Sequence, residues 1–187
     1  MTFQSLLSEE FILLDGGMGT MLRLSSGEVP EALCLSEPER VAAVHRAYIE
    51  AGSQIVFACT FGANRLKLEG TPLDAVSCVK AAIQLAKSVS DGRALVGLDV
   101  GPTGQLLQPA GTLTFEAAYE AYREVMIAAE EAGADLIAIE TMSDLLETKA
   151  AVLAAKETGA KVMAMAGGVA SNSQLRNTMN DKCQKAG

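Results

Sequence analysis

Four polar side chains are the best placed for chemistry, because each follows or ends a short apolar run: Asp15, Thr60, Asp99 and Glu140. If the runs are parallel strands, their carboxyl ends meet at one edge of a sheet, which is where (β/α) barrels and open α/β sheets bind ligands. The pattern predicts a ligand site at that edge and leaves its chemistry open. Helix capping is the alternative, since acidic and hydroxyl residues after strands often cap the next helix.

The elements that would position these residues alternate regularly. Apolar runs that predict strands lie at residues 11–14, 54–59, 94–100, 135–140 and 161–165. Segments of helical period lie at 36–51, 71–88, 114–132 and 143–158, with Ser36 and Thr114 as expected caps. Apolar strands that are each followed by a helix are typical of a parallel sheet covered by helices. We therefore expect an α/β fold of about five βα units.

The composition of the chain limits the classes of partner that it could bind. The chain has 187 residues, with 15 basic and 23 acidic side chains and a net charge of -8. That balance argues against nucleic-acid and anionic-membrane partners, which favour basic surfaces. No apolar run reaches the roughly 20 residues of a membrane-spanning helix, and no secretory signal is visible. The four cysteines are scattered, which favours free thiols in the cytoplasm.

Familiar catalytic motifs are missing from the sequence. The turn at residues 16–19 is Gly-Gly-Met-Gly and lacks the dinucleotide-binding spacing. Neither a phosphate-binding loop nor a serine nucleophile elbow occurs. His45 shares a helical face with Val41 and Tyr48, which indicates a packed residue. We assign no catalytic residue from these patterns.

Five stretches carry a resemblance to a known family. Leu-Asp-Gly-Gly-Met-Gly-Thr-Met-Leu at residues 14–22 resembles the opening of the homocysteine-binding barrel of bacterial cobalamin-dependent methionine synthases, in the homocysteine S-methyltransferase family. Four more stretches follow in the family's order, at residues 44–52, 60–65, 101–104 and 139–144. The resemblance covers about residues 11–165.

The resemblance implies a (β/α)₈ barrel that transfers a methyl group to the sulfur of homocysteine. In that family three cysteine thiolates hold a zinc ion, and zinc removes the proton of the homocysteine thiol. The matching positions imply that Asp15 and Glu140 hold the amino-acid end of homocysteine beside Gly16 and Gly17. Thr60 and Asp99 would line the same mouth. The methyl donor would be methylcobalamin on a separate domain or a methylated small molecule.

The chain also departs from the family. A barrel of this kind usually needs roughly 250 residues, and the family's zinc ligands follow its sixth and eighth strands, which we expect this chain to lack. Cys59 lies beside Thr60, where the family commonly has asparagine, and one thiolate cannot replace three. We therefore expect a partial barrel over residues 1–165 that has no metal ligands. A self-associating half-barrel without catalytic activity is the alternative, and an independent enzyme built on Asp15, Glu140 and Cys59 is a further one.

The last 22 residues depart in another way. Residues 166–176, Ala-Gly-Gly-Val-Ala-Ser-Asn-Ser-Gln-Leu-Arg, resemble a segment near the end of the tRNA threonylcarbamoyladenosine synthesis protein. The alternative is a glycine-rich turn followed by a helix that Ser171 or Asn172 caps. We expect residues 166–187 to be a foreign or divergent segment, and a fused or shifted reading frame would account for it.

Overall fold

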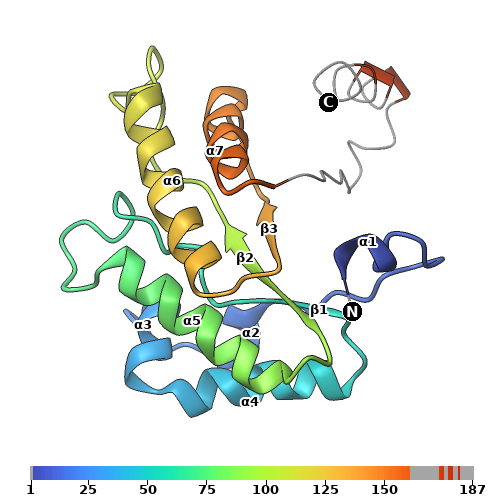
Figure 1. Ribbon diagram of the computed structural model, residues 1–187. Helices are drawn as coiled ribbons and strands as arrows, with labels where there is room; N and C mark the ends of the chain where they lie inside the picture. Colours follow the sequence, from blue (N-terminus) through green and yellow to red (C-terminus); the bar gives the residue numbers. More distant parts are fainter. Residues whose placement is uncertain (1, 161–172, 175–176, 179–180, 182–187) are drawn as a thin grey trace.

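A parallel sheet of three strands lies at the centre of the computed structural model, which describes residues 2–160, 173–174, 177–178 and 181. The strands are β1 (Ile55–Phe57), β2 (Leu95–Val100) and β3 (Leu136–Ile139), in that order across the sheet (Figure 1). Ile55 pairs with Leu95, and Gly97 pairs with Leu136. The α/β class with parallel strands is therefore as expected.

The predicted buried strand at residues 11–14 is wrong. Only Leu14 forms a bridge to the sheet, pairing in parallel with Ile55. Phe11 and Leu14 are 69% and 52% exposed. The backbone of Leu13 forms hydrogen bonds with Gln54 and Ile55. The apolar side chains of the segment stay largely uncovered. The predicted strand at 161–165 lies outside the described residues.

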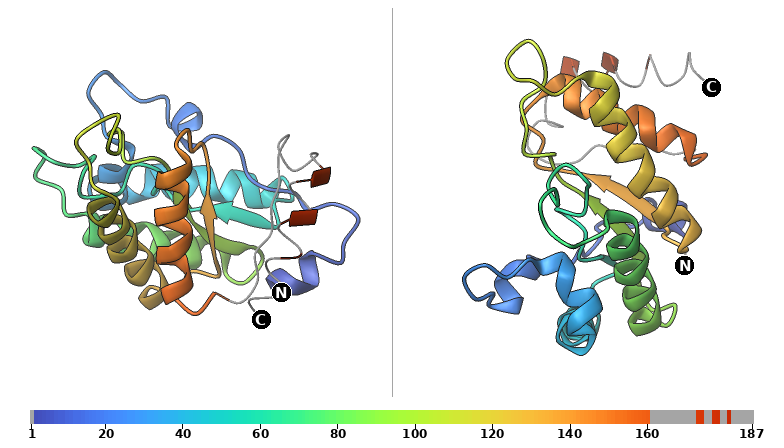
Figure 2. Two further views of the ribbon diagram at one scale, coloured as in Figure 1. Left: turned by 90° about the horizontal axis from the view of Figure 1, so that it is seen from above. Right: turned by 90° about the vertical axis from the view of Figure 1, so that its left-hand side faces the viewer.

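A long helix follows each strand, and the long helices cover one face of the sheet. In chain order the helices are α1 (Phe3–Leu6), α2 (Met18–Leu22), α3 (Pro30–Ser36), α4 (Pro38–Glu50), α5 (Ala75–Ser90), α6 (Phe115–Glu131) and α7 (Leu145–Glu157). The long helices α4 to α7 lie on one side of the strands, whereas the short α1 lies on the other (Figures 1 and 2). The edge that carries the predicted site is the carboxyl end of this sheet.

Caps fix where the helices begin. The Thr114 hydroxyl accepts a hydrogen bond from the Ala117 N–H, which confirms the predicted cap of α6. The predicted Ser36 cap is wrong. Ser36 ends α3, and its hydroxyl donates to the Ala32 carbonyl. Pro38 begins the next helix instead, because proline fits the first turn, where its missing N–H costs nothing.

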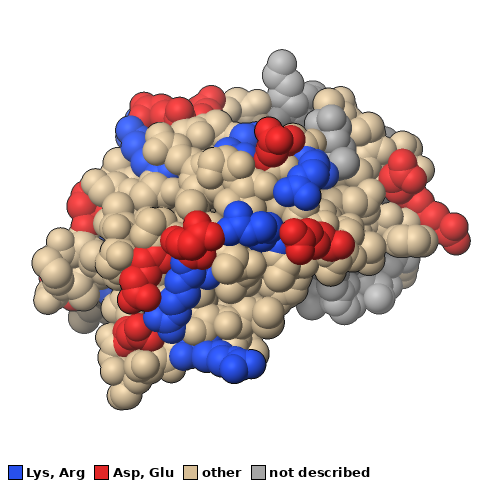
Figure 3. Space-filling view, turned by 90° about the horizontal axis from the view of Figure 1, so that it is seen from below, with Lys and Arg blue, Asp and Glu red and all other residues tan. Residues whose placement is uncertain are grey.

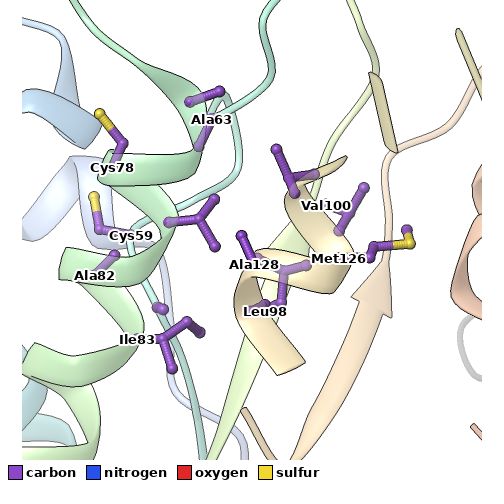
Figure 4. Packing of buried hydrophobic residues seen from close by; sticks show 14 of the residues in the cluster. Cys59, Ala63, Cys78, Ala82, Ile83, Leu98, Val100, Met126 and Ala128 are labelled. Atoms are coloured by element: carbon purple, nitrogen blue, oxygen red, sulfur yellow. The ribbon is translucent and has the colours of Figure 1, made fainter. Parts of the chain in front are cut away.

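The two faces of the sheet bury different residues. On the helix side, Val96, Leu98 and Val100 pack with residues of α5 and α6 such as Ile83 and Met126 (Figure 4). On the other side, Leu6 of α1 packs on Ile55 and Leu95 and forms a second, smaller core. Side chains alternate along a strand, so Asp99 faces the same side as Leu95.

Ion pairs join neighbouring helices at the surface. Lys80 of α5 pairs with Glu131 of α6, and Arg123 of α6 pairs with Glu157 of α7. On the face shown in Figure 3, acidic and basic side chains are interspersed and form no patch of one sign. Within the described part of the chain, no helix has both the length and the apolar character needed to cross a bilayer.

Candidate functional site

Asp15 is anchored at the carboxyl end of β1. Its Oδ2 accepts a hydrogen bond from the Phe57 N–H at 2.9 Å, and its own N–H donates to the Ile55 carbonyl at 3.1 Å. Two contacts on one strand fix both the backbone and the side chain. The carboxylate therefore lies at the edge where the sequence placed it.

Asp99 lies one strand further across the sheet, next to the last residue of β2. It faces the side opposite to the buried Leu98 and Val100. Its Oδ1 is buried and has no hydrogen-bond partner among the described residues. A buried carboxylate oxygen without a donor is costly, and such an atom suggests a group that the structure does not contain.

The charges of these residues act on one another. Burial raises the pKa of Asp15 from its usual 3.8 to about 6, and the negative charge of Glu140 adds to the rise. Burial raises the pKa of Asp99 to about 7, with further contributions from Glu140, Asp15 and Glu31. Glu140 follows β3 directly and is exposed. The structure thus brings together three of the predicted side chains, and a cation among them would relieve their repulsion.

The Thr60 hydroxyl binds the backbone of the neighbouring strand, and its role at the ligand mouth stays a prediction. Its hydroxyl donates to the Asp99 carbonyl at 2.9 Å and accepts from the Asp99 N–H at 3.0 Å. Both hydrogen-bonding capacities of the buried hydroxyl are used on the backbone. Thr60 therefore joins the ends of β1 and β2 and holds Asp99 in place.

The predicted glycine turn lies at the start of α2. Gly17 is the N-cap of that helix. A Cβ on Gly16 would lie 2.8 Å from the hydroxyl oxygen of Tyr48 on α4. The close approach that glycine permits here is therefore to Tyr48, a contact the sequence did not indicate.

A small hollow lies between the end of β2 and α6, on the helix side of the sheet, where Leu98, Val100 and Val125 also line it. Its volume is about 10 Å³, which is room for about one water molecule. Its wall includes Thr60, Asp99, Gly101 and Tyr122. An amino acid would not fit inside it, so a ligand of that size would bind at the open edge, above the hollow.

Two buried glutamates near this edge were missed by sequence reasoning. Glu31 of α3 accepts the Gly62 N–H, and Glu147 of α7 accepts the Thr103 N–H. Both loops follow strands that carry the site. The only sequence signal for Glu147 is its position three residues after the Asp144 cap, which predicts a capping box and not a buried contact.

The described cysteines are buried in the main core. Cys34, Cys59 and Cys78 are free thiols. Cys78 lies on α5 and Cys59 follows β1, and both pack among the core residues in Figure 4. A hydrogen bond with Cys34 and burial raise the pKa of Cys59 well above its usual range. A zinc ligand must be a thiolate, so the raised pKa of Cys59 does not favour that role. Across the described ranges, no group of three or more His, Cys, Asp or Glu residues is arranged to hold a metal ion.

A family model for homocysteine S-methyltransferase matches residues 12–185. The chain belongs to the homocysteine S-methyltransferase family. Two methionine synthases are similar in sequence. The one from Mycobacterium tuberculosis is 31% identical and the one from Mycobacterium leprae 29% identical, each over 170 residues. Each alignment covers 80% of this chain and 14% of the relative, so the chain spans a small part of these longer proteins.

Solved structures of homocysteine methyltransferases have the same fold. The metallated form of MmuM from Escherichia coli superposes with a TM-score of 0.73 at 24% identity, over 83% of this chain and 62% of that one. The apo form gives 0.61 at 22% identity. The family match includes most of residues 166–187. The resemblance of that segment to a tRNA-modification protein remains a prediction, since nearly all of it lies outside the described residues.

Proposed function

We propose that this homocysteine S-methyltransferase family member binds the amino-acid end of homocysteine at the carboxyl edge of the sheet, as one portion of a (β/α) barrel. Asp15, Asp99 and Glu140 face the ammonium group of the substrate. The methyl group is transferred to the substrate's sulfur. In this proposal the bridge at Leu14 and the three strands of the sheet are successive units of the barrel.

The unpartnered Oδ1 of Asp99, beside two other carboxylates, is the observation that carries the proposal. A primary ammonium has three N–H donors and one positive charge. It would supply the missing hydrogen bond, and its charge would offset the burial and the mutual repulsion that raise the pKa of Asp15 and Asp99. Gly16 and Gly17 directly follow Asp15 in the sequence, so in this proposal the amino-acid end of the ligand lies beside that turn.

In this proposal the described residues bind and orient the amino acid. None of them is assigned as a metal ligand. Zinc, when bound in this family, lowers the pKa of the substrate thiol. The described cysteines are not grouped as metal ligands, and a hydrogen bond with Cys34 together with burial raises the pKa of Cys59 well above its usual range. The proposal therefore takes the zinc ligands and the methyl donor, methylcobalamin or a methylated small molecule, from outside the described residues.

The test is calorimetric titration of the full chain with L-homocysteine at pH 8, with and without added zinc. The control ligand is 4-mercaptobutanoate, which keeps the thiol and carboxylate but lacks the ammonium. We expect homocysteine to bind and the control ligand to fail. Asp99→Asn and Glu140→Gln should each weaken binding about tenfold or more, since a hydrogen bond to a charged group contributes roughly 1.5–3 kcal/mol.

The matched control variant is Glu130→Gln, which makes the same change of net charge at an exposed position of α6. It should bind as the parent does. Equal binding of 4-mercaptobutanoate would contradict recognition of the ammonium, and no binding of homocysteine in either condition would overturn the proposal.

A self-associating module is a second candidate, supported by the exposed apolar side chains beside β1. Phe11, Leu13 and Leu14 are all largely exposed, and a sheet edge with apolar neighbours is a surface that a second chain can cover. Light scattering of the parent chain and of Leu14→Lys would test it. A monomeric parent would contradict this candidate, whereas a dimer that the substitution dissociates would support it.

A further inference from the structure

A buried carboxylate on α7 contacts two other parts of the fold. The Glu147 side chain is 2% exposed. Its Oε1 accepts three hydrogen bonds: from the Thr103 N–H at 2.7 Å, from the Thr103 hydroxyl at 2.6 Å and from the Tyr122 hydroxyl at 2.9 Å. One oxygen atom thus joins α7, α6 and the loop after β2.

Both ends of this contact lead to site residues. Thr103 lies four residues after Asp99, on a loop whose Gly101 N–H donates to the Phe61 carbonyl. Glu147 lies seven residues after Glu140, in the first turn of α7, where Asp144 caps the helix through the Leu146 and Glu147 N–H groups. The contact therefore joins the segment that carries Asp99 to the segment that carries Glu140.

The direction of the Glu147 side chain is informative. A glutamate at this position of a helix commonly turns back to the cap residue and completes a capping box. Here it reaches into the protein instead, although a buried carboxylate is costly unless it is well hydrogen-bonded. The three hydrogen bonds that its Oε1 accepts offset the cost of this burial.

The backbone between Glu140 and the start of α7 is strained. Thr141, directly after Glu140, has a φ of 57°. A β-branched residue rarely adopts the left-handed region, and such residues persist where the surrounding structure holds them. The anchored start of α7 lies three residues further on, at Asp144, and supplies that support.

We infer that Glu147 is a positioning residue, whose Oε1 sets the separation of Asp99 and Glu140 by holding the Thr103 loop against the start of α7. It contacts no substrate itself. Tyr122 also lines the hollow beside Asp99, so the same contact shapes that wall. The effect of Glu147 on homocysteine binding rests on the proposed function. Its effect on the separation of Asp99 and Glu140 can be tested without a ligand.

The test distinguishes two roles of Glu147, as a hydrogen-bond acceptor and as a negative charge. Glu147→Gln retains an oxygen at the position of Oε1, whereas Glu147→Met has a similar length and no acceptor. The readout is the pKa of the Asp99 carboxyl in the full chain, followed by NMR. Asp15, Glu31 and Glu140 are the charged groups that act on this pKa, so it reports how closely they surround Asp99.

We expect Glu147→Gln to leave the pKa of Asp99 unchanged. Glu147→Met should lower that pKa by about one and weaken homocysteine binding on the order of tenfold, because small displacements of a binding group are costly. Ala151→Gly is the matched control, since it destabilises the buried face of the same helix without touching this contact. It should lower the melting temperature and leave the pKa and the affinity unchanged.

Two results would overturn the inference. One is a folded Glu147→Met protein with an unaltered pKa of Asp99, and the other is a Glu147→Gln protein that behaves like Glu147→Met. If the methionine variant does not fold, Tyr122→Phe removes one of the three donors and should move the pKa in the same direction by less; no change there would also overturn it. If the parent chain binds no homocysteine, the proposed function fails while the pKa comparison still decides the role of Glu147.

Discussion

The Glu31 carboxylate of α3 accepts a hydrogen bond from the backbone N–H of Gly62 at 2.6 Å, although 31 positions separate the two residues in the sequence. The glutamate is buried, and a Cβ on Gly62 would lie 2.6 Å from its Oε1. A side chain at position 62 would therefore displace the Glu31 carboxylate from this hydrogen bond. The pair joins the short helix α3 to the end of the strand that anchors Asp15.

Removing the Glu31 acceptor should destabilise the fold. Glu31→Leu would leave the Gly62 N–H buried without a partner, at a cost of roughly 1–3 kcal/mol in the free energy of unfolding. Glu31→Gln keeps an acceptor and should lose clearly less. Denaturant unfolding measures both, with the exposed Glu130→Leu as a control for the change of residue type. Equal losses in the two Glu31 variants would contradict a hydrogen-bonding role.

Asp99→Asn should stabilise the protein at high pH while it weakens ligand binding. A folded-state pKa of about 7, against 3.8 in the ordinary carboxyl, means that the folded protein binds more protons between those values. Stability therefore falls as the pH rises from about 4 to about 7, by roughly 2–4 kcal/mol for this group. Thermal unfolding at pH 4.5 and pH 8 should show a gain for the variant mainly at pH 8. A gain of equal size at both values would count against a raised pKa.

The titration of His45 should change stability with pH in the direction opposite to that of Asp99. Its side chain is fully buried, neither ring nitrogen has a hydrogen-bond partner within the described ranges, and burial lowers its pKa from 6.5 to about 4. The folded state resists the proton that the unfolded state accepts, so stability is lost as the pH falls from about 6.5 to about 4, by roughly 3 kcal/mol.

His45→Leu tests this prediction, because leucine fills the site without titrating. The difference in unfolding free energy between the variant and the parent should grow in favour of the variant as the pH is lowered through that window. A constant difference from pH 7 to pH 4 would show that the imidazole titrates normally.

Thr60→Val should loosen the ends of β1 and β2. Valine keeps the shape of threonine but leaves both the Asp99 N–H and the Asp99 carbonyl without their hydroxyl partner. We expect a loss of roughly 1–3 kcal/mol, whereas Thr60→Ser, which retains the hydroxyl, should lose less. Chemical denaturation compares the two. A loss of homocysteine affinity in Thr60→Val that Thr60→Ser restores would show that the effect on the site passes through Asp99.

Sequence reasoning located the parts of the fold that depend on local pattern. Thr114 caps α6 as predicted, because the cap depends on residues close by in the sequence. The strands at 55–57, 95–100 and 136–139 lie within their predicted ranges, since burial on both faces makes such runs almost continuously apolar. For the same reason Asp15, Asp99 and Glu140 could be assigned to one edge of the sheet.

The features that sequence reasoning missed depend on what lies opposite a residue. Leu14 was expected to be buried, but an apolar side chain is buried only where a neighbour covers it. The hydrogen bonds of the Thr60 hydroxyl to the backbone of β2 depend on which strand lies beside it, and the local sequence does not indicate that. Glu147 occupies a cap-like position, so its inward direction left no mark in the local sequence.

The short helix α1 covers the amino ends of β1 and β2 on the face where Asp99 lies at the opposite end. The same strands thus begin in an apolar cluster, the floor of the sheet, and end at a group of carboxylates, its rim. Mutations at Ile55 or Leu95 and mutations at Asp99 should accordingly fall into separate classes, the first changing how much protein survives in a cell and the second how well each surviving molecule works. Evolution could then retune the rim for another amino acid while the floor continues to hold the chain together.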